Sequence, residues 1–341
     1  MMKLAIIGIG KMGMLHAGIM NALDDVELCA VSDSTNFLLN GVKSLKPELN
    51  TYDNYVKMLD KEQPDAVVIA TPVFLHVPMA EECTKRNIPF FLEKPLSPAS
   101  DQAVELIEMV ESKDLVTMVG YMMRYVDTYM KAKAILESGV LGKVITVHST
   151  IYVAQLFRKG KGWRYSKEQA GGGVVIGQAT HLIDLLQWML GPVERVTGHT
   201  INWYSEEVED FAHVHFEFKN GAMGWMDSSW SIRHHRLMQI NIEIHAEKGN
   251  LFVCDDYAKL YLDEPADGFN AGWTNWYNPD LFHGVEIDVG GPQYSRQGIA
   301  FIDAVKNGKP VASDLRNAFE VQKIVDAIYK SAENHGQPTD V

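Results

Sequence analysis

The chain has 341 residues, 46% of them hydrophobic and 22% charged, which is the composition of a soluble globular protein with enough length for two domains. Asp and Glu (44) outnumber Lys and Arg (31), and the net charge of −13 argues against sequence-independent nucleic-acid binding and against adhesion to anionic membranes. No apolar run approaches the roughly 20 residues that span a bilayer, and the apolar stretch 4–7 is too short for a signal peptide, so we predict a cytoplasmic protein.

The first 120 residues alternate short apolar runs, typical of buried strands, with stretches of helical periodicity. Such alternation indicates βαβ units and therefore a parallel sheet. The predicted strands are 3–8, 26–32, 66–70, 88–92 and 116–120, and the predicted helices are 12–23, 52–59, 77–86 and 99–112.

Beyond about residue 142 the pattern changes to consecutive extended runs, of which 213–218 alternates with period two, as antiparallel strands with one wet face do. A single helix, 180–190, interrupts them and ends at Gly191, and residues 298–332 are helical again. The predicted strands are 144–153, 193–202, 211–219, 222–231, 239–246 and 250–253.

We therefore predict an α/β protein with two domains. Residues 1–122 form a doubly wound parallel sheet that binds a dinucleotide, and residues 123–341 form an α+β domain with a large, mostly antiparallel open sheet. The C-terminal helices could pack back on the first domain.

A dinucleotide fingerprint, GxGxxG, lies between the first predicted strand and the first predicted helix. Gly8 permits the tight turn, Gly10 lets the backbone approach a diphosphate, and Gly13 lets helix and strand pack closely. The diphosphate would rest on the amino terminus of the helix, which Lys11 and Met12 open.

Asp33 ends the next predicted strand, twenty residues after Gly13, where it would hydrogen-bond the ribose hydroxyls of NAD and repel the 2′-phosphate of NADP. Ser34, Thr35 and Asn36 provide no arginine for that phosphate, and only Lys43 and Lys46 favour it. NAD is thus the predicted cofactor, with NADP as the alternative.

Two further strand ends carry candidate residues. Ala70, Thr71 and Pro72 should line the nicotinamide side of the cofactor, and His76, close behind them, either contacts the cofactor or caps and packs a helix. Glu93 and Lys94 follow the buried run 88–92, and the carboxyl end of such a strand faces the ligand crevice of an open α/β sheet. Lys94 is therefore predicted to lie where the cofactor places its reacting carbon.

Together these residues resemble the Gfo/Idh/MocA family, the glucose–fructose oxidoreductase and inositol dehydrogenase group, over nearly the whole chain. The resemblance implies a Rossmann domain followed by an α/β domain whose open sheet often forms oligomers, and hydride transfer on sugars, cyclitols and their derivatives. The motifs that carry it are the glycine fingerprint, 65–72, 93–95, 120–125, Gly139-x-x-Gly142-Lys143, and Gly171–Gly173 leading to His181-x-x-Asp184.

The resemblance implies that Lys94 is a general acid/base or a substrate anchor, that its peptide bond to Pro95 is cis, and that His181 contacts the substrate. The chemistry fits independently, because oxidising an alcohol requires a base, and partial burial next to cationic NAD⁺ would lower the pKa of a lysine. Asp184 shares a helix face with His181 and either orients the imidazole or serves the structure.

Gly177 departs from the family pattern, which usually has an aspartate four residues before this histidine. Gln178 could occupy part of the same space, but an amide cannot accept a proton. Either Lys94 and His181 suffice for catalysis, or the activity differs from plain dehydrogenation.

Four further residues are candidates for binding substrate: Tyr121, Arg124, Trp163 and Arg164, the last two in a loop that could close over the site. An aromatic segment, 273–277 with Phe282, His283 and Tyr294, reads as an irregular region that either stacks on a sugar or contacts another subunit. No metal site is predicted, because His213/His215 and His234/His235 lack partners at ligand spacing and the three cysteines are far apart.

The sequence is compatible with three functions. The first is an NAD-dependent dehydrogenase of a sugar, cyclitol or related polyol, working as a homo-dimer or homo-tetramer through the C-terminal sheet. The second is an enzyme that retains NAD and cleaves glycosides or epimerises by transient oxidation. The third is a cofactor-bound sensor without catalysis, which the intact Lys94 argues against.

Overall fold

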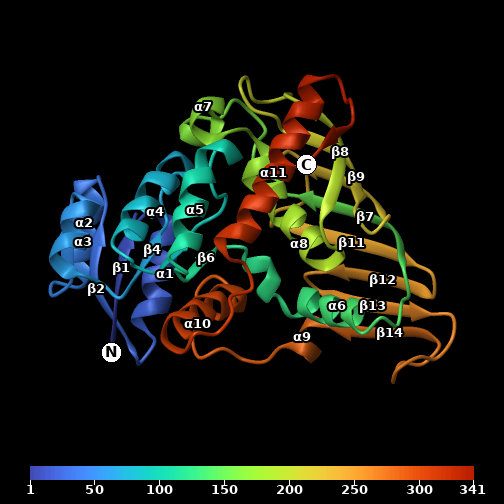
Figure 1. Cartoon of the computed structure of the whole chain (residues 1–341), viewed down its shortest axis with the longest axis horizontal. Coiled ribbons are helices and arrows are strands. Elements are labelled where there is room, and N and C mark those ends of the chain that lie inside the picture. The colour runs from blue at the N-terminus through green and yellow to red at the C-terminus, as the bar shows by residue number, and fades with distance from the viewer. The chain divides into compact units, whose positions relative to one another are not determined.

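The computed structural model describes residues 1–341, and the chain divides into two compact units. The first unit comprises residues 1–122 and 284–319, and the second comprises residues 123–283 and 320–341. Each unit is built on a single sheet, and both sheets can be followed in Figure 1.

The sheet of the first unit has six parallel strands in the order β3-β2-β1-β4-β5-β6. The order reverses between β1 and β4, and this switch point is where doubly wound sheets bind ligands. The strands are β1 (Met2–Ile7), β2 (Val26–Ser32), β3 (Asn50–Tyr52), β4 (Ala66–Ile69), β5 (Phe90–Leu92) and β6 (Thr117–Val119).

The central strands form because they are apolar without interruption, as strands covered by helices on both faces must be. Every residue of β4 is fully buried, as is every residue of β5. The helices of this unit are α1 (Lys11–Asn21), α2 (Asn36–Leu45), α3 (Tyr55–Glu62), α4 (His76–Lys85), α5 (Val104–Ser112) and α10 (Pro292–Asn307), with short 3₁₀ turns η1 (Val73–Leu75), η2 (Ser100–Ala103) and η3 (Met122–Tyr125), the last entering the second unit.

The predicted helix 52–59 is wrong at its start. Tyr52 pairs with Ser32 of β2 and ends strand β3, and the helix α3 begins only at Tyr55. The boundary is fixed by Asn54, whose side chain accepts a hydrogen bond from the main-chain N–H of Lys57 at 3.0 Å and so caps the helix. Strand β3 and helix α2 were not predicted. Strand β3 has only three residues at the edge of the sheet, and α2 buries only Leu39 and Val42.

The sheet of the second unit has nine strands in the order β14-β13-β12-β11-β7-β10-β9-β8-β15. All neighbours are antiparallel except β7 and β10, which run parallel. The strands are β7 (Val144–Tyr152), β8 (Val193–Ile201), β9 (Phe211–Phe218), β10 (Met223–Ser229), β11 (Gln239–Ala246), β12 (Gly249–Cys254), β13 (Tyr257–Leu262), β14 (Gly272–Tyr277) and β15 (Thr339–Asp340).

Burial alternates along these strands, because only one face of the sheet carries helices. In β9, for example, Ala212 and Val214 are buried while His213 between them is exposed. Helix α6 packs against β12 and β13, and α8 packs against β7. The helices of this unit are α6 (Asp127–Glu137), α7 (Lys167–Ala170), α8 (Thr180–Leu190), α9 (Asn278–Leu281) and most of α11 (Leu315–Glu333), with the 3₁₀ turn η4 (Trp163–Tyr165) and the π-helical turn η5 (Val175–Ala179).

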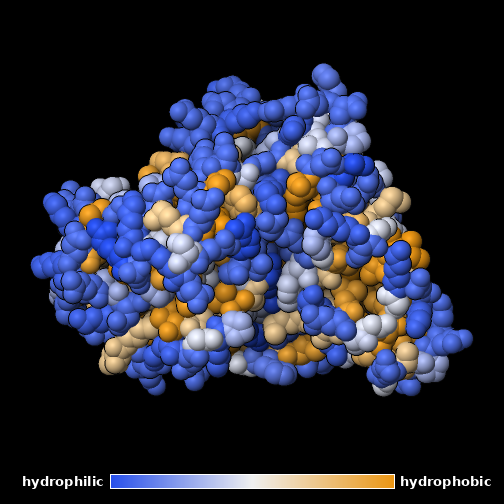
Figure 2. Space-filling model, viewed as in Figure 1, coloured by the Kyte–Doolittle hydropathy of each residue, from blue (hydrophilic) through white to orange (hydrophobic).

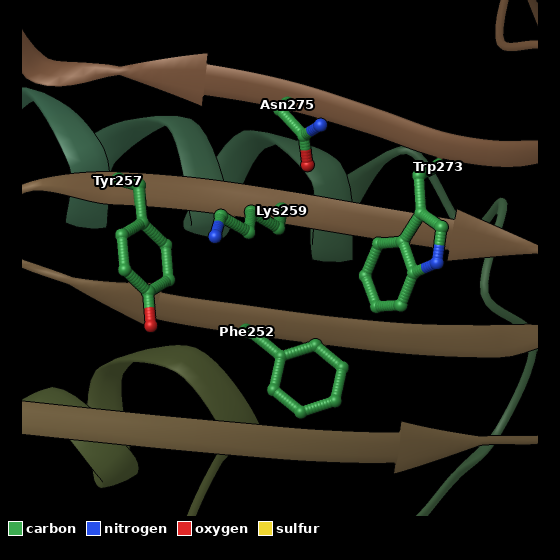
Figure 3. Close-up of a pocket in the computed structure, with 5 residues that line it drawn as sticks. All are labelled: Phe252, Tyr257, Lys259, Trp273 and Asn275. Carbon is green, nitrogen blue, oxygen red and sulfur yellow. The ribbon is translucent and has the colours of Figure 1, made fainter.

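The aromatic segment 273–277, predicted to be irregular, is strand β14 and pairs along its length with β13. Figure 3 shows Trp273 and Asn275 of β14 beside Lys259 of β13 and Phe252 of β12. Strand β13 and helix α6 were not predicted either. Lys259 interrupts the apolar residues of β13, and α6 buries only Thr128, Tyr129, Ala132 and Ile135.

The predicted fold class is confirmed, with a parallel doubly wound sheet in one unit and a mostly antiparallel sheet in the other. Figure 2 shows hydrophilic residues over much of α2 and α3, as expected of helices on the outside of the first sheet. None of the helices combines the length and the apolar character that crossing a membrane requires.

Candidate active site

The glycine fingerprint joins β1, β4 and α1 at the switch point of the first sheet. Gly8 has a φ of +87°, and a Cβ atom there would lie 2.6 Å from the carbonyl oxygen of Ala70. A Cβ atom at Gly13 would collide with the carbonyl oxygen of Gly8. The strand ends and the first turn of α1 are thus packed main chain against main chain, which only glycine allows.

Gly10 differs from the other two glycines, because a Cβ atom there would meet nothing within 4 Å. It is the N-cap of α1, and no side chain caps the first N–H groups of that helix. Lys11, the first helical residue, is exposed, and Met12 is half-buried. Open space before uncapped N–H groups is the geometry that a diphosphate requires, so the loop fits a dinucleotide.

Asp33 is half-buried at the end of β2, with its carboxylate held against the same loop. One oxygen accepts a hydrogen bond from the main-chain N–H of Ile9 at 2.9 Å, and the other accepts one from Thr35 at 2.8 Å. The carboxylate is therefore fixed next to the glycines, with lone pairs remaining for ribose hydroxyls.

The end of β4 is tied to the turn after β5 by His76. Ala70, Thr71 and Pro72 follow β4 and are each half-buried. His76 is buried, and its Nδ1 and Nε2 atoms lie 2.8 Å from the carbonyl oxygen of Pro95 and 2.9 Å from that of Thr71. Burial lowers the pKa of this imidazole, while the two carbonyl groups act in the opposite direction. With both nitrogens facing main-chain oxygens, the geometry favours the packing role for His76 over a cofactor contact.

Glu93, Lys94 and Pro95 form the turn that follows β5, and the Lys94–Pro95 peptide bond is cis, as predicted. Lys94 is half-buried, whereas Glu93 is buried and places Oε1 2.7 Å from Nε2 of His16 in α1. His16 was not identified from the sequence, because a histidine on the buried side of a helix carries no signal that separates it from ordinary core residues.

The end of β6 lies against the same turn. A Cβ atom at Gly120 would lie 3.3 Å from the carboxyl carbon of Glu93 and 3.1 Å from the ring of Phe91. Tyr121, a predicted substrate residue, comes directly after Gly120 and is 1% exposed. The ends of β1, β4, β5 and β6 thus bring the predicted residues of the first unit to one edge of the sheet.

In the second unit, Arg124 and Asp184 form a buried ion pair. The guanidinium donates to both carboxylate oxygens, from Nε at 2.8 Å and from Nη2 at 2.6 Å, and Arg124 also lies over the ring of Trp188. Burial raises the pKa of Asp184, and the charge of Arg124 opposes that rise. The ion pair with Arg124 gives Asp184 a structural role, and His181 is buried on the same helix.

Gly177 belongs to η5, the π-helical turn that leads into α8. A Cβ atom at this position would lie 3.3 Å from the indole ring of Trp230, which is tighter than ordinary van der Waals contact. Trp230 is held in place, since its Nε1 donates to Asp210 at 3.0 Å and its ring meets that of Tyr165 at 5.7 Å. The indole therefore bounds the space that the usual aspartate side chain would enter.

The neighbours of Gly177 are engaged within the second unit. The amide of Gln178 donates to Oε1 of Gln155 at 3.2 Å. Arg164 is exposed and lies over the ring of Trp163, 5.0 Å from its centre, in the turn η4. The next residue, Tyr165, connects this turn to Trp230 and was not identified from the sequence.

A second unpredicted residue, Glu209, anchors the glycine run before η5. Its buried carboxylate accepts hydrogen bonds from the N–H groups of Gly173 and Val175 and from the hydroxyl of Tyr329, each at 2.9 Å. Burial raises the pKa of Glu209, and these donors counteract it. Side chains at Gly172 and Gly173 would collide with Tyr329 and with the main chain of Glu209, so these glycines are required by packing.

Residues 2–121 match the model of an oxidoreductase family with an NAD-binding Rossmann fold, and residues 129–252 match the GFO/IDH/MocA C-terminal domain. The chain belongs to the Gfo/Idh/MocA family. As a member it is an NAD-dependent oxidoreductase, and the predicted family, enzyme class and cofactor are confirmed.

Relatives within the family differ in their named activities. A myo-inositol 2-dehydrogenase from Thermotoga maritima is 26% identical over 258 residues, covering 74% of this chain and 75% of the relative. A 2,7-anhydro-N-acetylneuraminate hydratase from Mediterraneibacter gnavus is 22% identical over 339 residues, covering 92% and 88%. A solved levoglucosan dehydrogenase with NADH shares the fold, with a TM-score of 0.89 at 21% identity over 100% of this chain and 99% of that one.

Of the two histidine pairs considered as metal ligands, His213/His215 lies on β9 and His234/His235 lies between β10 and β11. His213 lies on β9 of the second sheet with Nδ1 2.6 Å from a carboxylate oxygen of Asp227 on β10. No group of three or more His, Cys, Asp or Glu side chains converges as metal ligands would. His213 and Asp227 therefore form a cross-strand pair.

Proposed function

We propose that the protein oxidises a secondary alcohol of a sugar, cyclitol or related polyol, with Lys94 as the acid/base and His181 assisting. The observation that carries the proposal is the position of Lys94. It follows β5 at the sheet edge where the glycine loop ends β1 and Asp33 ends β2, and its turn is tied to that edge through His76.

The chemistry follows from these positions. Bound NAD⁺ supplies a hydride acceptor. The hydroxyl proton must leave as the hydride does, and the neutral amine of Lys94 takes it at Nζ. His181 would hydrogen-bond the reacting hydroxyl and so help to hold it, while the tight loop at Gly8 and Gly13 and the carboxylate of Asp33 orient the cofactor.

Asp33 also supports a preference for NAD over NADP. Its carboxylate is fixed beside the glycine loop, where it would repel a 2′-phosphate. Tyr121, Gln178, Trp163 and Arg164 remain the proposed substrate contacts. The name of the inositol-specific relative supports a cyclic polyol as the substrate class.

A second candidate function is supported by the environment of Gly177. The carboxylate that usually accompanies Lys94 and His181 is absent, and Trp230 bounds its place. The relative named a hydratase shows that a family member can carry a name that describes addition of water rather than net oxidation. An enzyme that retains NAD and oxidises its substrate transiently, for glycoside cleavage or epimerisation, is therefore the alternative. Membership of an enzyme family argues against the non-catalytic sensor.

We also propose a homo-dimer or homo-tetramer through the face of the second sheet that carries no helices. This face exposes large side chains, including Trp225 (55%) on β10 and Trp273 (56%) on β14. Tyr257, Lys259 and Phe252 continue it beside Trp273 in Figure 3. Light scattering of the purified chain measures its oligomeric state, and a monomer at micromolar concentration contradicts the proposal.

The test of function begins with inositols, aldoses and other polyols offered with NAD⁺, read as absorbance of the reduced cofactor. With the best substrate, Lys94→Ala is expected to lower turnover by about 10²- to 10⁴-fold and to change NAD affinity by less than about threefold. Lys57→Met removes an exposed lysine of α3 and serves as the matched control. Turnover by Lys94→Ala equal to that of the control overturns the mechanism. Bound NAD with cleavage of aryl glycosides but no net reduction favours the second candidate.

A further inference from the structure

A buried histidine–glutamate pair lies at the turn that carries Lys94. His16 of α1 is 0% exposed and Glu93 is 9% exposed, and Nε2 of the ring lies 2.7 Å from Oε1 of the carboxylate. The ring also packs on Phe91, with ring centres 4.9 Å apart. The two residues are 77 positions apart in the chain, so the contact is a product of the fold.

The surroundings of the second ring nitrogen of His16, Nδ1, indicate which nitrogen carries the proton in this pair. Nδ1 is buried and has no hydrogen-bond partner. A proton on Nδ1 would be a buried, unsatisfied donor, which is costly, whereas a bare lone pair costs less. The arrangement is therefore satisfied by a ring with its proton on Nε2, which donates to the Glu93 carboxylate.

Three titratable side chains from three helices face Glu93. Besides His16 they are His76 of α4 and Tyr294 of α10, and the charge of Glu93 acts on both. Burial, with the charge of Glu93 second, raises the pKa of Tyr294. From β6, Gly120 approaches without a side chain, and a Cβ atom there would lie 3.3 Å from Oε2 of Glu93.

The turn is held on both sides of Lys94. The residue before it is bound through its side chain to His16, and the residue after it is bound through its carbonyl oxygen to His76. Glu93 is buried with its carboxylate against His16, whereas the adjacent Lys94 is half-buried. The contact with His16 therefore fixes the position of the carboxylate within the turn.

We propose that His16 is a positioning residue, which holds the Glu93 carboxylate away from Lys94 and thereby keeps the amine available as a base. A carboxylate released next to Lys94 would stabilise the ammonium form and hold the proton that catalysis has to move. The inference deepens the function proposed above and rests on Lys94 being the acid/base.

The experiment is the pH profile of kcat/KM for the wild type, His16→Leu, Glu93→Gln and the double variant. His16→Leu keeps an apolar contact with Phe91 but donates nothing. It is expected to raise the midpoint of the rise in activity by about one pH unit and to lower kcat about 10- to 100-fold. The double variant has no carboxylate to release, so its midpoint should equal that of Glu93→Gln.

Two further variants separate positioning from folding. His16→Gln retains an N–H donor and is expected to keep the wild-type midpoint. Met58→Ala creates a cavity in α3 of the same unit and is expected to lower Tm without moving the midpoint. A His16→Leu midpoint equal to that of wild type, with Tm lowered as in Met58→Ala, overturns the inference.

Activity measurements on Lys94→Ala distinguish a failure of the His16 inference from a failure of the proposed function. If Lys94→Ala keeps its activity, the assignment of Lys94 fails and this inference fails with it. If Lys94→Ala is inactive while the midpoint of His16→Leu is unchanged, only the role of His16 is overturned.

Discussion

The glycine-loop edge of the first unit and the α8 region of the second unit are built in different ways. At the first, main chain packs on main chain: the carbonyl group of Ala70 leaves no room for a side chain at Gly8, and that of Gly8 leaves none at Gly13. In the second, buried charged and aromatic side chains define the space: Arg124 with Asp184, and Trp230 with Asp210. The first arrangement depends on glycines at particular positions. The second depends on contacts between side chains that are far apart in the sequence.

This difference bears on what each region can vary. Main-chain packing is fixed by the fold and leaves the cofactor chemistry constant, whereas a site lined by side chains changes with each substitution. The single family departure noted from the sequence, at Gly177, indeed falls in the second region.

The largest effect is expected from three glycines that lie close together in the chain. Gly13→Ala puts a methyl group into the carbonyl oxygen of Gly8, so it should cost about 3 kcal/mol or more and abolish NAD binding. Gly10→Ala meets nothing, so it should fold normally but lose NAD affinity by more than about tenfold if a diphosphate occupies that space. Gly18→Ala, an open position inside α1, should bind NAD normally and gain about 0.5–1 kcal/mol.

Thermal unfolding and NAD titration of the three variants give the measurement. Equal NAD affinity in Gly10→Ala and Gly18→Ala would contradict the placement of the diphosphate, and a stable Gly13→Ala would contradict main-chain packing as the basis of this edge.

The two regions also differ in how far the sequence alone predicts them. Strands β4 and β5 are buried on both faces and read as unbroken apolar runs, and the spacing of the glycines predicts the loop after β1. Strands β13 and β14 were not predicted, because Lys259 and Asn275 interrupt their apolar and aromatic residues.

Contacts between residues far apart in the chain could not be predicted from the sequence either. Arg124 and Asp184 were both identified as candidates, yet nothing in a single sequence shows that they bind each other across 60 residues. The same holds for His16 with Glu93 and for Trp230 over Gly177. Local patterns specify elements and turns, but side-chain pairing depends on the finished packing.

The second expected effect concerns the ion pair of the α8 region. Arg124→Met leaves Asp184 buried without its partner and should lower the free energy of unfolding by about 3–5 kcal/mol. Arg124→Met with Asp184→Leu removes both charges and should recover most of that loss. Urea unfolding of the single and double variants measures the difference, and a double variant as unstable as the single one would contradict the pairing.

The pH dependence of this variant has a defined sign. Burial raises the pKa of Asp184 above its ordinary value, and loss of Arg124 removes the charge that opposes the rise. A carboxyl group whose pKa is raised in the folded state contributes stability at low pH that is lost as pH rises through that pKa. The deficit of Arg124→Met relative to wild type should therefore grow from pH 4 to pH 8.

The smallest effect on stability is expected at Gly177, a glycine that packs against a side chain, the indole of Trp230. Gly177→Ala places a Cβ atom 3.3 Å from Trp230, and the indole cannot easily yield because Asp210 and Tyr165 hold it. Replacing a glycine in a helical turn by alanine would by itself stabilise the protein. A net decrease of about 1 kcal/mol in the free energy of unfolding would therefore reflect the steric conflict between the new methyl group and the indole.

Trp230→Phe supplies the control for this substitution, because a smaller ring vacates part of the contact. In that background Gly177→Ala should be neutral or stabilising, and the difference between the two backgrounds is the coupling energy of the pair. Equal stability changes for Gly177→Ala in both backgrounds would show that main-chain packing, and not Trp230, limits this position, as it does at Gly8 and Gly13. A coupling energy clearly different from zero would show that Trp230 limits the side chain at position 177. The indole would then fill space that the aspartate usual in the family would need.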